Sequence, residues 1–401
     1  MGILPYADRV LVSGAGPVGL TIALGLARRG IPVVVVEQEP ALTIDPRAGT
    51  FHPPTLEMLE PYGIAQQMVA AGIPVRTWQI RDRRSSAVAE FDLGLLADLT
   101  PYPYRLHFEQ FKLTPLLLAA LEREPNAEVR FSTRFVKAEQ DDAGVRATVE
   151  RDGKSETIDC RWLIGADGGR SGVRRAGTFN FEGFTWPELF IVLSTAYDFA
   201  AHGFAMNSYL ADPEQWIAIF KMPGNGPPGV WRLSFPMDAA TSEETALAPE
   251  TAQALLQGFI SRPEPYAIEH RNVYRLHQRV ATDFRNGRTI LAGDAAHLNN
   301  PVGAFGLNSG IHDAIALIDA LDDVWHDRAG IEALDRYGAQ RRTAAIDHVQ
   351  ANSIRNKRQL EEKDPDVRRR NFEHLQHVAA TPELARDFLL NSSMIASVRR
   401  P

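Results

Sequence analysis

The chain has 401 residues, of which 44% are hydrophobic and 23% are charged. At roughly 100 to 200 residues per domain, this length predicts two to four domains with ample cores. The composition excludes collagen-like, coiled-coil and wholly disordered proteins. The net charge of −7, from 43 basic and 50 acidic side chains, argues against nonspecific binding to nucleic acid or to anionic membranes.

Cysteine content and hydropathy restrict the cellular compartment and the kinds of site that we expect. Cys160 is the one cysteine, so neither an intrachain disulfide nor a cysteine-rich zinc site can form, and we expect a reducing cytoplasm. No histidine spacing suggests a metal site. Val10 to Ala27 is an uncharged run near the length of a membrane span. Because glycines interrupt the run and no basic segment precedes it, we expect neither a membrane span nor a targeting signal.

Residues 8–37 are predicted to form a βαβ unit. Leu20 to Arg29 has helical composition, and Gly30 ends the helix just after two cations that suit its negative end. Ile31 to Val36 is an apolar run typical of a strand buried on both faces.

The next part of the chain predicts short strands and a helix. Residues 76–97 alternate in short pieces, and Gln110 to Glu122 has helical character. Asp152-Gly153 is a hairpin signal between two predicted strands, and Trp162 to Ala166 is an apolar strand.

From residue 179 to about 276 the sequence predicts a second, sheet-based domain inserted into the first. Its expected strands are rich in aromatic residues and include Leu189 to Ser194, Trp216 to Lys221 and Val230 to Phe235. Arg288 to Ala292 then resumes the parallel-strand pattern. A helix with one buried stripe follows, formed by Leu307, Ile311, Ala314, Ile318 and Leu321, and the chain after Gly338 is helical and charged.

A glycine-rich turn carries the first chemical signal. Gly14, Gly16 and Gly19 form G-x-G-x-x-G between a strand and a helix, and Glu37 ends the next strand. The spacing allows a tight turn, the approach of a pyrophosphate to backbone amides and close packing of helix on strand, while Glu37 can accept ribose hydroxyls. The alternative is a glycine-rich turn without a ligand. The motif predicts a dinucleotide but does not choose between FAD and NAD.

Two further strand ends carry polar residues. The strand ending at Ala166 leads into Asp167-Gly168, and the strand ending at Ala292 leads into Gly293 and Asp294. An Asp at the carboxyl end of a parallel strand lies where open α/β sheets bind ligands. The helix that begins near Leu307 directs its positive end there, which suits a flavin that becomes anionic when reduced. Each Asp alone could equally be a helix cap.

These three motifs resemble those of the single-component (class A) FAD-dependent aromatic hydroxylases, typified by para-hydroxybenzoate hydroxylase, over most of residues 8–340. The resemblance implies that Gly14, Gly16, Gly19 and Glu37 hold the ADP half of FAD. It also implies that Asp167 and Gly168 lie near FAD and the nicotinamide cofactor and that Asp294 binds the ribityl chain. Further flavin contacts are implied at Gly303, Gly306, Leu307 and Asn308, and Pro301 is implied to border the reaction site.

Two more positions match the family. Arg47-Ala48-Gly49 resembles a flavin-contacting arginine loop, and Gln110 is similar to an FAD-contacting glutamine. The alternatives are a surface arginine and a residue at a helix entry, since both residue types are common on surfaces.

The segment from Tyr197 to Ser208 is similar to the family's substrate-binding region. The resemblance implies that Tyr197 hydrogen-bonds a phenol, as Pro301 could through its carbonyl, and that Ser208 contacts a carboxylate. The family has an arginine two residues after the serine, whereas this chain has Leu210. A buried carboxylate without a cation is costly, so a carboxylate-bearing substrate requires Arg232 or another basic group. Tyr197 could instead be a core aromatic residue.

The resemblance implies an α/β fold: a Rossmann-like FAD-binding domain of the para-hydroxybenzoate hydroxylase type with an inserted sheet-rich substrate domain and a C-terminal helical segment. The expected boundaries are 1–75, 98–178 and 277–340 for the FAD-binding domain, 76–97 and 179–276 for the substrate domain, and 341–401 for the helical segment.

The implied activity is hydroxylation of a phenolic or hydroxy-heteroaromatic small molecule. NADH or NADPH would reduce FAD, O2 would form a flavin C4a-hydroperoxide, and the substrate ring would take one oxygen atom. The alternatives are an FAD-dependent reductase or dehydrogenase without oxygen insertion, and a binding module that has lost FAD. The charged C-terminal helices could also pair in a homodimer.

Overall fold

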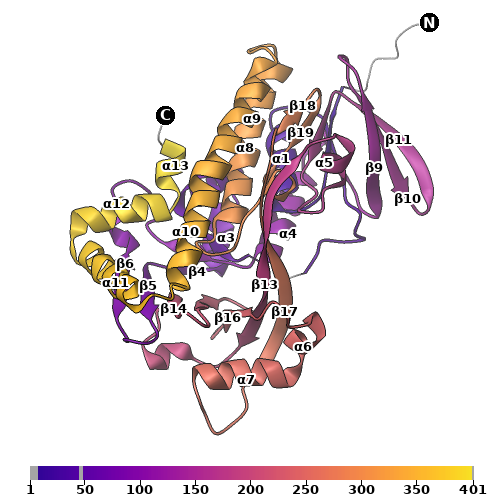
Figure 1. Cartoon of the computed structure of the whole chain (residues 1–401). Helices are drawn as coiled ribbons and strands as arrows, with labels where there is room; N and C mark the ends of the chain where they lie inside the picture. Colours follow the sequence, from indigo (N-terminus) through magenta and orange to yellow (C-terminus); the bar gives the residue numbers. More distant parts are fainter. Residues whose placement is uncertain (1–7, 45–47, 400–401) are drawn as a thin grey trace, which may run out of the picture.

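A computed structural model describes residues 8–44 and 48–399, and these residues form a mixed α/β structure (Figure 1). The strands are β1 (Val10–Ser13), β2 (Val33–Val36), β3 (Thr50–Phe51), β4 (Ile73–Val75), β5 (Thr77–Asp82), β6 (Val88–Asp92), β7 (Arg105–His107), β8 (Ala127–Arg130), β9 (Thr133–Gln140), β10 (Val145–Arg151), β11 (Lys154–Cys160), β12 (Trp162–Gly165), β13 (Phe181–Thr195), β14 (Asn207–Ala211), β15 (Ile217–Met222), β16 (Val230–Met237), β17 (Ile268–Ala281), β18 (Arg285–Asn286), β19 (Thr289–Leu291) and β20 (His297–Leu298). The α-helices are α1 (Pro17–Ala27), α2 (Pro53–Leu59), α3 (Ala65–Ala71), α4 (Gln110–Leu121), α5 (Gly172–Ala176), α6 (Glu243–Leu247), α7 (Pro249–Phe259), α8 (Phe305–Trp325), α9 (Glu332–Ala344), α10 (Ala351–Leu360), α11 (Pro365–Ala380), α12 (Pro382–Ser392) and α13 (Ile395–Arg399). Short helical segments are η1 (Glu60–Tyr62), η2 (Leu93–Leu96), η3 (Phe199–His202), η4 (Gly293–Ala295) and η5 (Ala345–Gln350).

The first sheet contains the predicted βαβ unit. Its strand order is β18-β19-β12-β1-β2-β8, and β1 runs parallel to both β2 and β12. Strand β12 is in turn parallel to β19. Every residue of β1, β2, β12 and β19 is buried, which explains their continuous apolar runs. The carboxyl ends of β1, β12 and β19 therefore lie next to one another, as the sequence predicted.

Helices α1 and α8 pack against each other beside this sheet. Gly25 of α1 permits the contact, since a Cβ there would lie 2.3 Å from Cδ1 of Ile318 in α8. Of the stripe predicted on α8, Leu307 is half-buried and the other four residues are fully buried. Helices α8 and α9 lie side by side along the upper part of the molecule (Figure 1).

The hairpin predicted at Asp152-Gly153 joins β10 to β11, and these strands form a separate three-stranded sheet with β9. Both turn residues have positive φ, +50° for Asp152 and +71° for Gly153. Asp and Gly are residue types that tolerate this conformation, and it matches the twist of a two-residue hairpin. The local sequence signal was therefore sufficient here.

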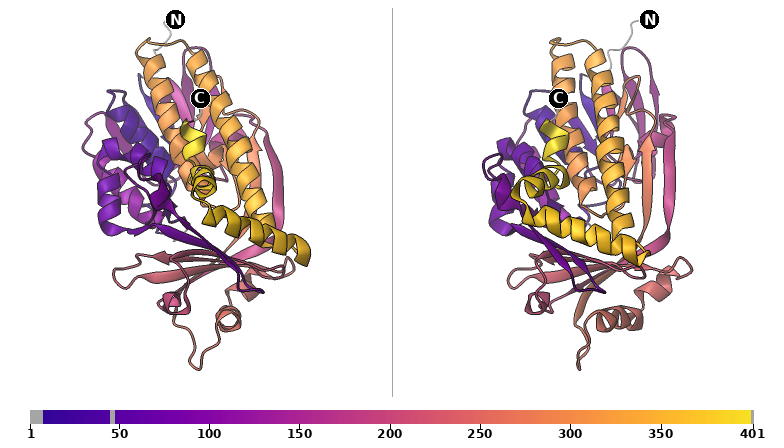
Figure 2. Two further views of the ribbon diagram at one scale, coloured as in Figure 1. Left: turned by 90° about the vertical axis from the view of Figure 1, so that its left-hand side faces the viewer. Right: turned by 60° about the vertical axis from the view of Figure 1, so that its left-hand side comes forward.

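The inserted region forms most of an eight-stranded sheet with the order β20-β17-β13-β16-β15-β14-β5-β6. Its long strands β13 and β17 run together from the upper to the lower part of the molecule (Figure 1). One face packs on α7 through a cluster that includes Ile191, Leu210 and Leu256. The other face packs on the C-terminal helices through Trp78 and Tyr209. Figure 2 shows α11 and α12 above this sheet and α7 below it.

The C-terminal helices are an integral part of this second core. Phe372, Leu375 and Val378 of α11 and Leu389 of α12 are buried in the same cluster as Trp78. Charge also joins the two regions, because the Arg368 guanidinium pairs with Asp82 of β5 at 2.7 Å. These contacts cover one face of the sheet with the last part of the chain.

The hydropathy of the helices shows whether any of them could span a membrane. In residues 8–44 and 48–399, no helix is both long enough and apolar enough to cross a membrane. The run from Val10 to Ala27 instead folds as β1, a turn and α1.

Candidate active site

The glycine-rich turn after β1 leaves one open position. Gly14 has a φ of +108°, a conformation that glycine adopts without strain. A Cβ on Gly19 would lie 2.0 Å from the Gly14 carbonyl oxygen, so this glycine allows α1 to pack against the turn. A Cβ on Gly16 would meet nothing within 4 Å. Gly16 therefore lies beside free space at the N-terminus of α1, where the helix dipole favours an anion.

Glu37 lies at the end of β2, next to this turn. Its Oε2 accepts a hydrogen bond from the Ala15 N–H at 2.8 Å, and its Oε1 accepts one from the Glu39 N–H at 3.0 Å. The carboxylate is thereby fixed within reach of a ligand on the turn. Each carboxylate oxygen has a second lone pair for a ribose hydroxyl.

Asp167, at the end of β12, caps a helix. Its Oδ2 accepts hydrogen bonds from the N–H groups of Gly172 at 2.7 Å and Val173 at 3.1 Å, at the start of α5. This is the alternative that the sequence left open for this carboxylate. Gly168, with a φ of +77°, has open space at its Cβ position. Asp294 is exposed in η4, at the end of β19.

A buried ion cluster supports the end of β19. Asp313 of α8 is fully buried and pairs with His297 at 2.7 Å and Arg341 at 2.6 Å, and it accepts a hydrogen bond from the Gly293 N–H at 3.0 Å. Burial favours the neutral acid, yet the charges of His297 and Arg341 hold the Asp313 pKa at about 2. His297 is thus a structural residue, and Asp313 fixes the turn that carries Asp294.

The start of α8 is held in place by its own side chains. Asn308 accepts hydrogen bonds at Oδ1 from the His52 N–H and the Thr55 hydroxyl, at 2.9 and 2.7 Å. Its Nδ2 donates to the carbonyls of Thr50 and Ala304, at 2.9 and 2.7 Å. The side chain therefore anchors α2 to α8. The backbone N–H groups of the first turn of α8 have no partner within the helix and can bind a ligand there, together with Gly306 and Leu307.

Gln110 begins α4 beside Ala48 and Gly49 of the predicted arginine loop. Its backbone N–H donates to the Ala48 carbonyl at 2.9 Å, and the Phe108 N–H donates to the Gly49 carbonyl at 2.8 Å. Arg47 lies outside the described residues. Gln110 and the residues that follow Arg47 are therefore neighbours in space.

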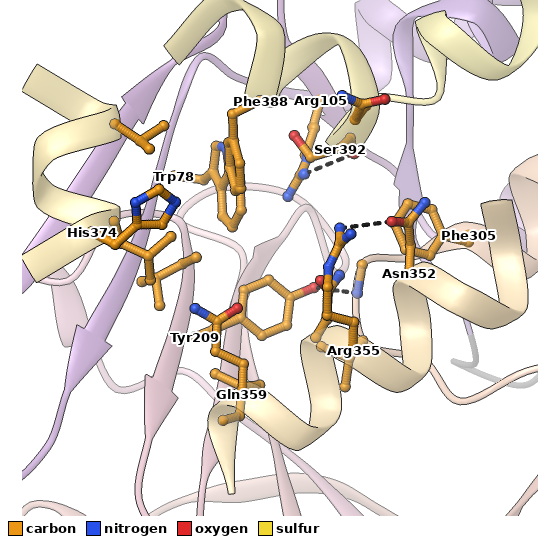
Figure 3. A pocket seen from close by; sticks show the side chains of 18 residues that line it. Trp78, Arg105, Tyr209, Phe305, Asn352, Arg355, Gln359, His374, Phe388 and Ser392 are labelled. Atoms are coloured by element: carbon orange, nitrogen blue, oxygen red, sulfur yellow. Dashed lines mark hydrogen bonds between the residues drawn. The ribbon is translucent and has the colours of Figure 1, made fainter. Parts of the chain in front are cut away.

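A cavity of about 390 Å³ lies between the eight-stranded sheet and the C-terminal helices (Figure 3). Its walls are aromatic on several sides, with Trp78, Tyr209, Phe305 and Phe388 among the lining residues. Trp78 and Phe388 stack with their ring centroids 5.9 Å apart. Val302 and Gly303, which directly precede α8, form one wall. The cavity therefore adjoins the loop that the sequence associated with the reaction site.

The loop at Gly303 is clamped from two sides. The Gly303 N–H donates to the Tyr209 hydroxyl oxygen at 3.1 Å, and His52 Nε2 donates to the Gly303 carbonyl at 2.9 Å. Burial lowers the pKa of His52 well below its usual value, so its ring is neutral. Burial raises the Tyr209 pKa, although Arg105 opposes the shift, so Tyr209 keeps its proton at neutral pH. Because the Tyr209 oxygen already accepts a hydrogen bond, its O–H can donate to a molecule in the cavity.

The cavity does not contain the three predicted catalytic residues. Tyr197 is half-buried on the α7 face of the sheet, where its hydroxyl lies 2.6 Å from His202 Nε2 and its ring packs on Phe199. Ser208 is buried and donates to the Ala205 carbonyl at 3.0 Å. Pro301 is exposed, and its carbonyl accepts a hydrogen bond from the Ala304 N–H. Alternation along β14 directs Tyr209 to the cavity and Leu210 to the α7 face.

Comparison with known proteins agrees with this arrangement. The sequence profile of a family described as "FAD binding domain" matches residues 8–352. Para-nitrophenol 4-monooxygenase of Pseudomonas sp. strain WBC-3 is 35% identical over 96% of this chain and 95% of its own. The 6-hydroxy-3-succinoylpyridine 3-monooxygenase of Pseudomonas putida strain S16 is 36% identical over 89% and 90%. The crystal structure of p-nitrophenol 4-monooxygenase from Pseudomonas putida DLL-E4 superposes with a TM-score of 0.90, at 31% identity over 98% of this chain and 99% of that one.

The chain belongs to the FAD-dependent aromatic hydroxylases. It is therefore a flavoprotein monooxygenase, and the family resemblance seen in the three sequence motifs is confirmed. Its cofactor is FAD, its reductant is NADH or NADPH, and its substrates are O2 and an aromatic small molecule. The reductase and binding-module alternatives are not supported by these relatives, which are monooxygenases.

The residues at the strand ends fit FAD in this aromatic hydroxylase. The free space at Gly16 would admit a diphosphate to the N-terminus of α1, and the Glu37 carboxylate beside it could accept hydroxyls of the adenosine ribose. The first turn of α8 offers backbone N–H groups and the positive end of its dipole to an anionic ring.

Sequence reasoning missed most of the cavity of this aromatic hydroxylase. Trp78, Arg105 and Tyr209 belong to no motif, and the contribution of α10 to α12 was not foreseen. One signal was present: Phe372, Leu375 and Val378 repeat at helical spacing and indicate a buried stripe on α11. That stripe predicts packing but not a role in a site.

Proposed function

We propose that the protein hydroxylates a phenolic or hydroxy-heteroaromatic compound of one or two rings in the cavity beside Gly303. The observation that carries this proposal is that an aromatic cavity of about 390 Å³ adjoins the loop before α8. This volume is near the lower end of the roughly 300–1,000 Å³ of small-molecule sites, so it suits a small ring system. The names of the two curated relatives, para-nitrophenol 4-monooxygenase and 6-hydroxy-3-succinoylpyridine 3-monooxygenase, also refer to single-ring substrates.

The cofactor would be held by three groups of residues. Gly14, Gly16, Gly19 and Glu37 would bind its ADP half at α1, and Asp167, Gly168 and Asp294 would lie along the adjoining strand ends. The turn before α8 and its first residues would approach the flavin ring. In this region the predicted contacts are Gly303, Gly306, Leu307 and Asn308. Arg47 and Gln110 are the remaining predicted contacts. The geometry at Gly16, Glu37 and the start of α8 supports this assignment, and Asp167 would act chiefly by shaping its loop.

When bound, FAD supplies the transfer of electrons from NADH or NADPH to O2 and of one oxygen atom to the ring. Tyr209 would donate its O–H to the substrate's phenolic oxygen, and its own oxygen is fixed by the Gly303 N–H. Trp78 and Phe388, which stack on each other, would pack against the aromatic ring and exclude water from it. The protein would thus orient the ring toward the loop before α8.

Product analysis with labelled oxygen tests this function. The purified holoenzyme is mixed with NADH or NADPH and a panel of phenols, hydroxypyridines and hydroxyquinolines under 18O2. We expect at least one compound to stimulate NAD(P)H oxidation and to gain one labelled oxygen atom. The proposal fails if the compounds bind and none is oxygenated, even though the flavin is reduced.

A Tyr209→Phe variant tests the donor. It should lower kcat while leaving FAD bound, because the ring packing remains and only the O–H is lost. Tyr197→Phe is the matched control, since Tyr197 lies on the opposite face of the sheet and its loss should leave kcat unchanged. Equal effects of the two substitutions would contradict the assignment of Tyr209.

Three further expectations complete the proposal. The boundary between the FAD-binding and substrate domains is supported by the separate hydrophobic cores of the first sheet and of the α7 face, whereas the 341–401 segment shares the second core with the substrate domain. We propose a cytoplasmic protein that does not bind nucleic acid, in keeping with its net charge of −7. A homodimer would have to use surfaces other than the apolar stripes of α11 and α12, because the second core already buries them. Light scattering of the holoenzyme, which gives its molar mass, tests whether a homodimer forms.

A further inference from the structure

Arg105 has an unusual environment for a cation. It lies in β7, is 1% exposed and lines the cavity. Figure 3 shows its guanidinium extending into the space between the Trp78 and Phe388 rings and Arg355. The guanidinium carbon lies 4.3 Å from the centroid of Trp78, which fixes the orientation of the group.

The hydrogen bonds of Arg105 are incomplete. Its Nη2 donates to the Ser392 carbonyl at 3.2 Å. Its Nε and Nη1 are buried and have no hydrogen-bond partner among residues 8–44 and 48–399. Burial lowers the Arg105 pKa to about 10, so the group is still charged at neutral pH. A buried charge with unused donors is costly unless a ligand supplies the acceptors.

The surroundings of Arg105 favour an anion. Within the described ranges, no Asp or Glu lines the cavity, whereas a second arginine, Arg355, does. Arg355 is exposed, and its Nη2 donates to Asn352 Oδ1 at 2.7 Å, so it is already solvated and paired. His52 and His107 are neutral neighbours of Arg105, because burial lowers the pKa of each and the charge of Arg105 adds to the effect. Arg105 is therefore the dominant positive charge in the interior of the cavity.

We propose that the substrate is an aromatic acid and that Arg105 binds its carboxylate through one of its unused donors, Nε or Nη1. This inference rests on the proposed function and defines its substrate class. The charged N–H donors of a guanidinium suit the oxygens of a carboxylate, and the Trp78 and Phe388 rings beside it suit the aromatic body of the molecule. Arg105 thus supplies the basic group that is absent at Leu210, which lies on the α7 face of the sheet.

Matched ligand pairs test the proposal by binding alone. Hydroxybenzoates, hydroxyphenylacetates and 3-(hydroxyphenyl)propionates are each compared with their amides, and Kd is measured on the holoenzyme from quenching of Trp fluorescence. We expect the best carboxylate to bind the wild-type protein about tenfold or more tightly than its amide, as for a charge-assisted pair. In Arg105→Gln this preference should fall below about threefold, while Arg355→Gln should retain most of it.

A conservative variant guards against loss of folding. Arg105→Lys keeps the charge but not the planar guanidinium and its several donors, so it should retain part of the carboxylate preference. The proposal is overturned if no carboxylate binds the wild-type protein better than its amide, or if the preference persists in Arg105→Gln. It is also overturned if Arg105→Gln weakens binding of the hydroxylated acids and of their amides by the same factor, because Arg105 would then bind the phenolic oxygen that both ligands share.

These outcomes are separate from a failure of the proposed function. A carboxylate that binds through Arg105 without gaining labelled oxygen would contradict hydroxylation and leave the anion site intact. Hydroxylation of a phenol by a protein that shows no preference for carboxylates would contradict the anion site and leave the proposed hydroxylation intact.

Discussion

The glycine-rich turn allows a prediction that separates a ligand-binding glycine from a packing glycine. Gly16→Ala adds a methyl group that meets no protein atom within 4 Å, at a residue with ordinary extended backbone, φ −73° and ψ 178°. Gly19→Ala places a Cβ 2.0 Å from the Gly14 carbonyl oxygen, so α1 or the turn must move. The two substitutions are chemically identical and differ only in what surrounds them.

The expected magnitudes differ accordingly. In Gly16→Ala the free energy of unfolding of the apoprotein should change by less than about 0.5 kcal/mol. Its FAD affinity should fall about 10- to 150-fold, because the methyl group displaces a diphosphate from hydrogen bonds worth about 1.5–3 kcal/mol. In Gly19→Ala the apoprotein itself should lose about 1–3 kcal/mol through overpacking. Gly258→Ala, in the last turn of α7 with open space at its Cβ position, should leave FAD affinity unchanged.

The assay combines flavin titration with chemical unfolding. FAD is removed, its rebinding is followed by quenching of flavin fluorescence, and unfolding of each apoprotein in urea is followed by circular dichroism. The reasoning is refuted if Gly16→Ala binds FAD within threefold of the wild-type affinity. A Gly19→Ala apoprotein as stable as wild type would refute the packing argument independently.

Three other predictions concern stability and the cavity. Burial lowers the His107 pKa to about 4, so between pH 6.5 and 4 the unfolded chain binds more protons than the folded one. The free energy of unfolding should therefore decrease as the pH is lowered, by roughly 1.4 kcal/mol per pH unit from this residue. The urea midpoints of wild type and His107→Gln should be closer at pH 5 than at pH 7, and an equal difference at both pH values would contradict the prediction. Asp313→Asn leaves Arg341 without its buried partner and should lower the free energy of unfolding by about 3–5 kcal/mol, whereas a loss under about 1 kcal/mol would show that water or another group replaces the carboxylate. Phe388→Ala should admit water to the cavity and so divert NAD(P)H oxidation toward peroxide. The readout is the amount of peroxide formed per NAD(P)H consumed. Leu384→Ala, at an exposed position on the same helix, should give the wild-type ratio.

The cofactor region was predictable because its signals are local. Gly14 requires a positive φ, and the third glycine of the motif allows the close approach of α1, so both leave a mark on the sequence at fixed spacing. The apolar strands β1, β2 and β12 carry their burial in their composition. Because parallel strands of one sheet end at the same edge, three motifs far apart in the sequence are expected to lie together at that edge.

The substrate region was not predictable in the same way. Both faces of β14 are buried, so its sequence Asn-Ser-Tyr-Leu-Ala shows no polar alternation that would tell which side chains face the cavity. The prediction of Tyr197 and Ser208 depended on the family resemblance instead, whereas the cavity is lined by Tyr209. Resemblance matched the segment from Tyr197 to Ser208 but could not determine which face of the sheet each side chain occupies.

Sequence by itself determined the family, the cofactor and the meeting of three strand ends, because glycine backbone requirements and apolar runs are properties of short segments. Only the tertiary structure decided where the substrate cavity lies and which charge it contains. Arg105 is placed against the Ser392 carbonyl, 287 residues later in the chain, when α12 packs over the sheet. No local pattern encodes such a contact, because it depends on how the eight-stranded sheet and the C-terminal helices together bury one guanidinium.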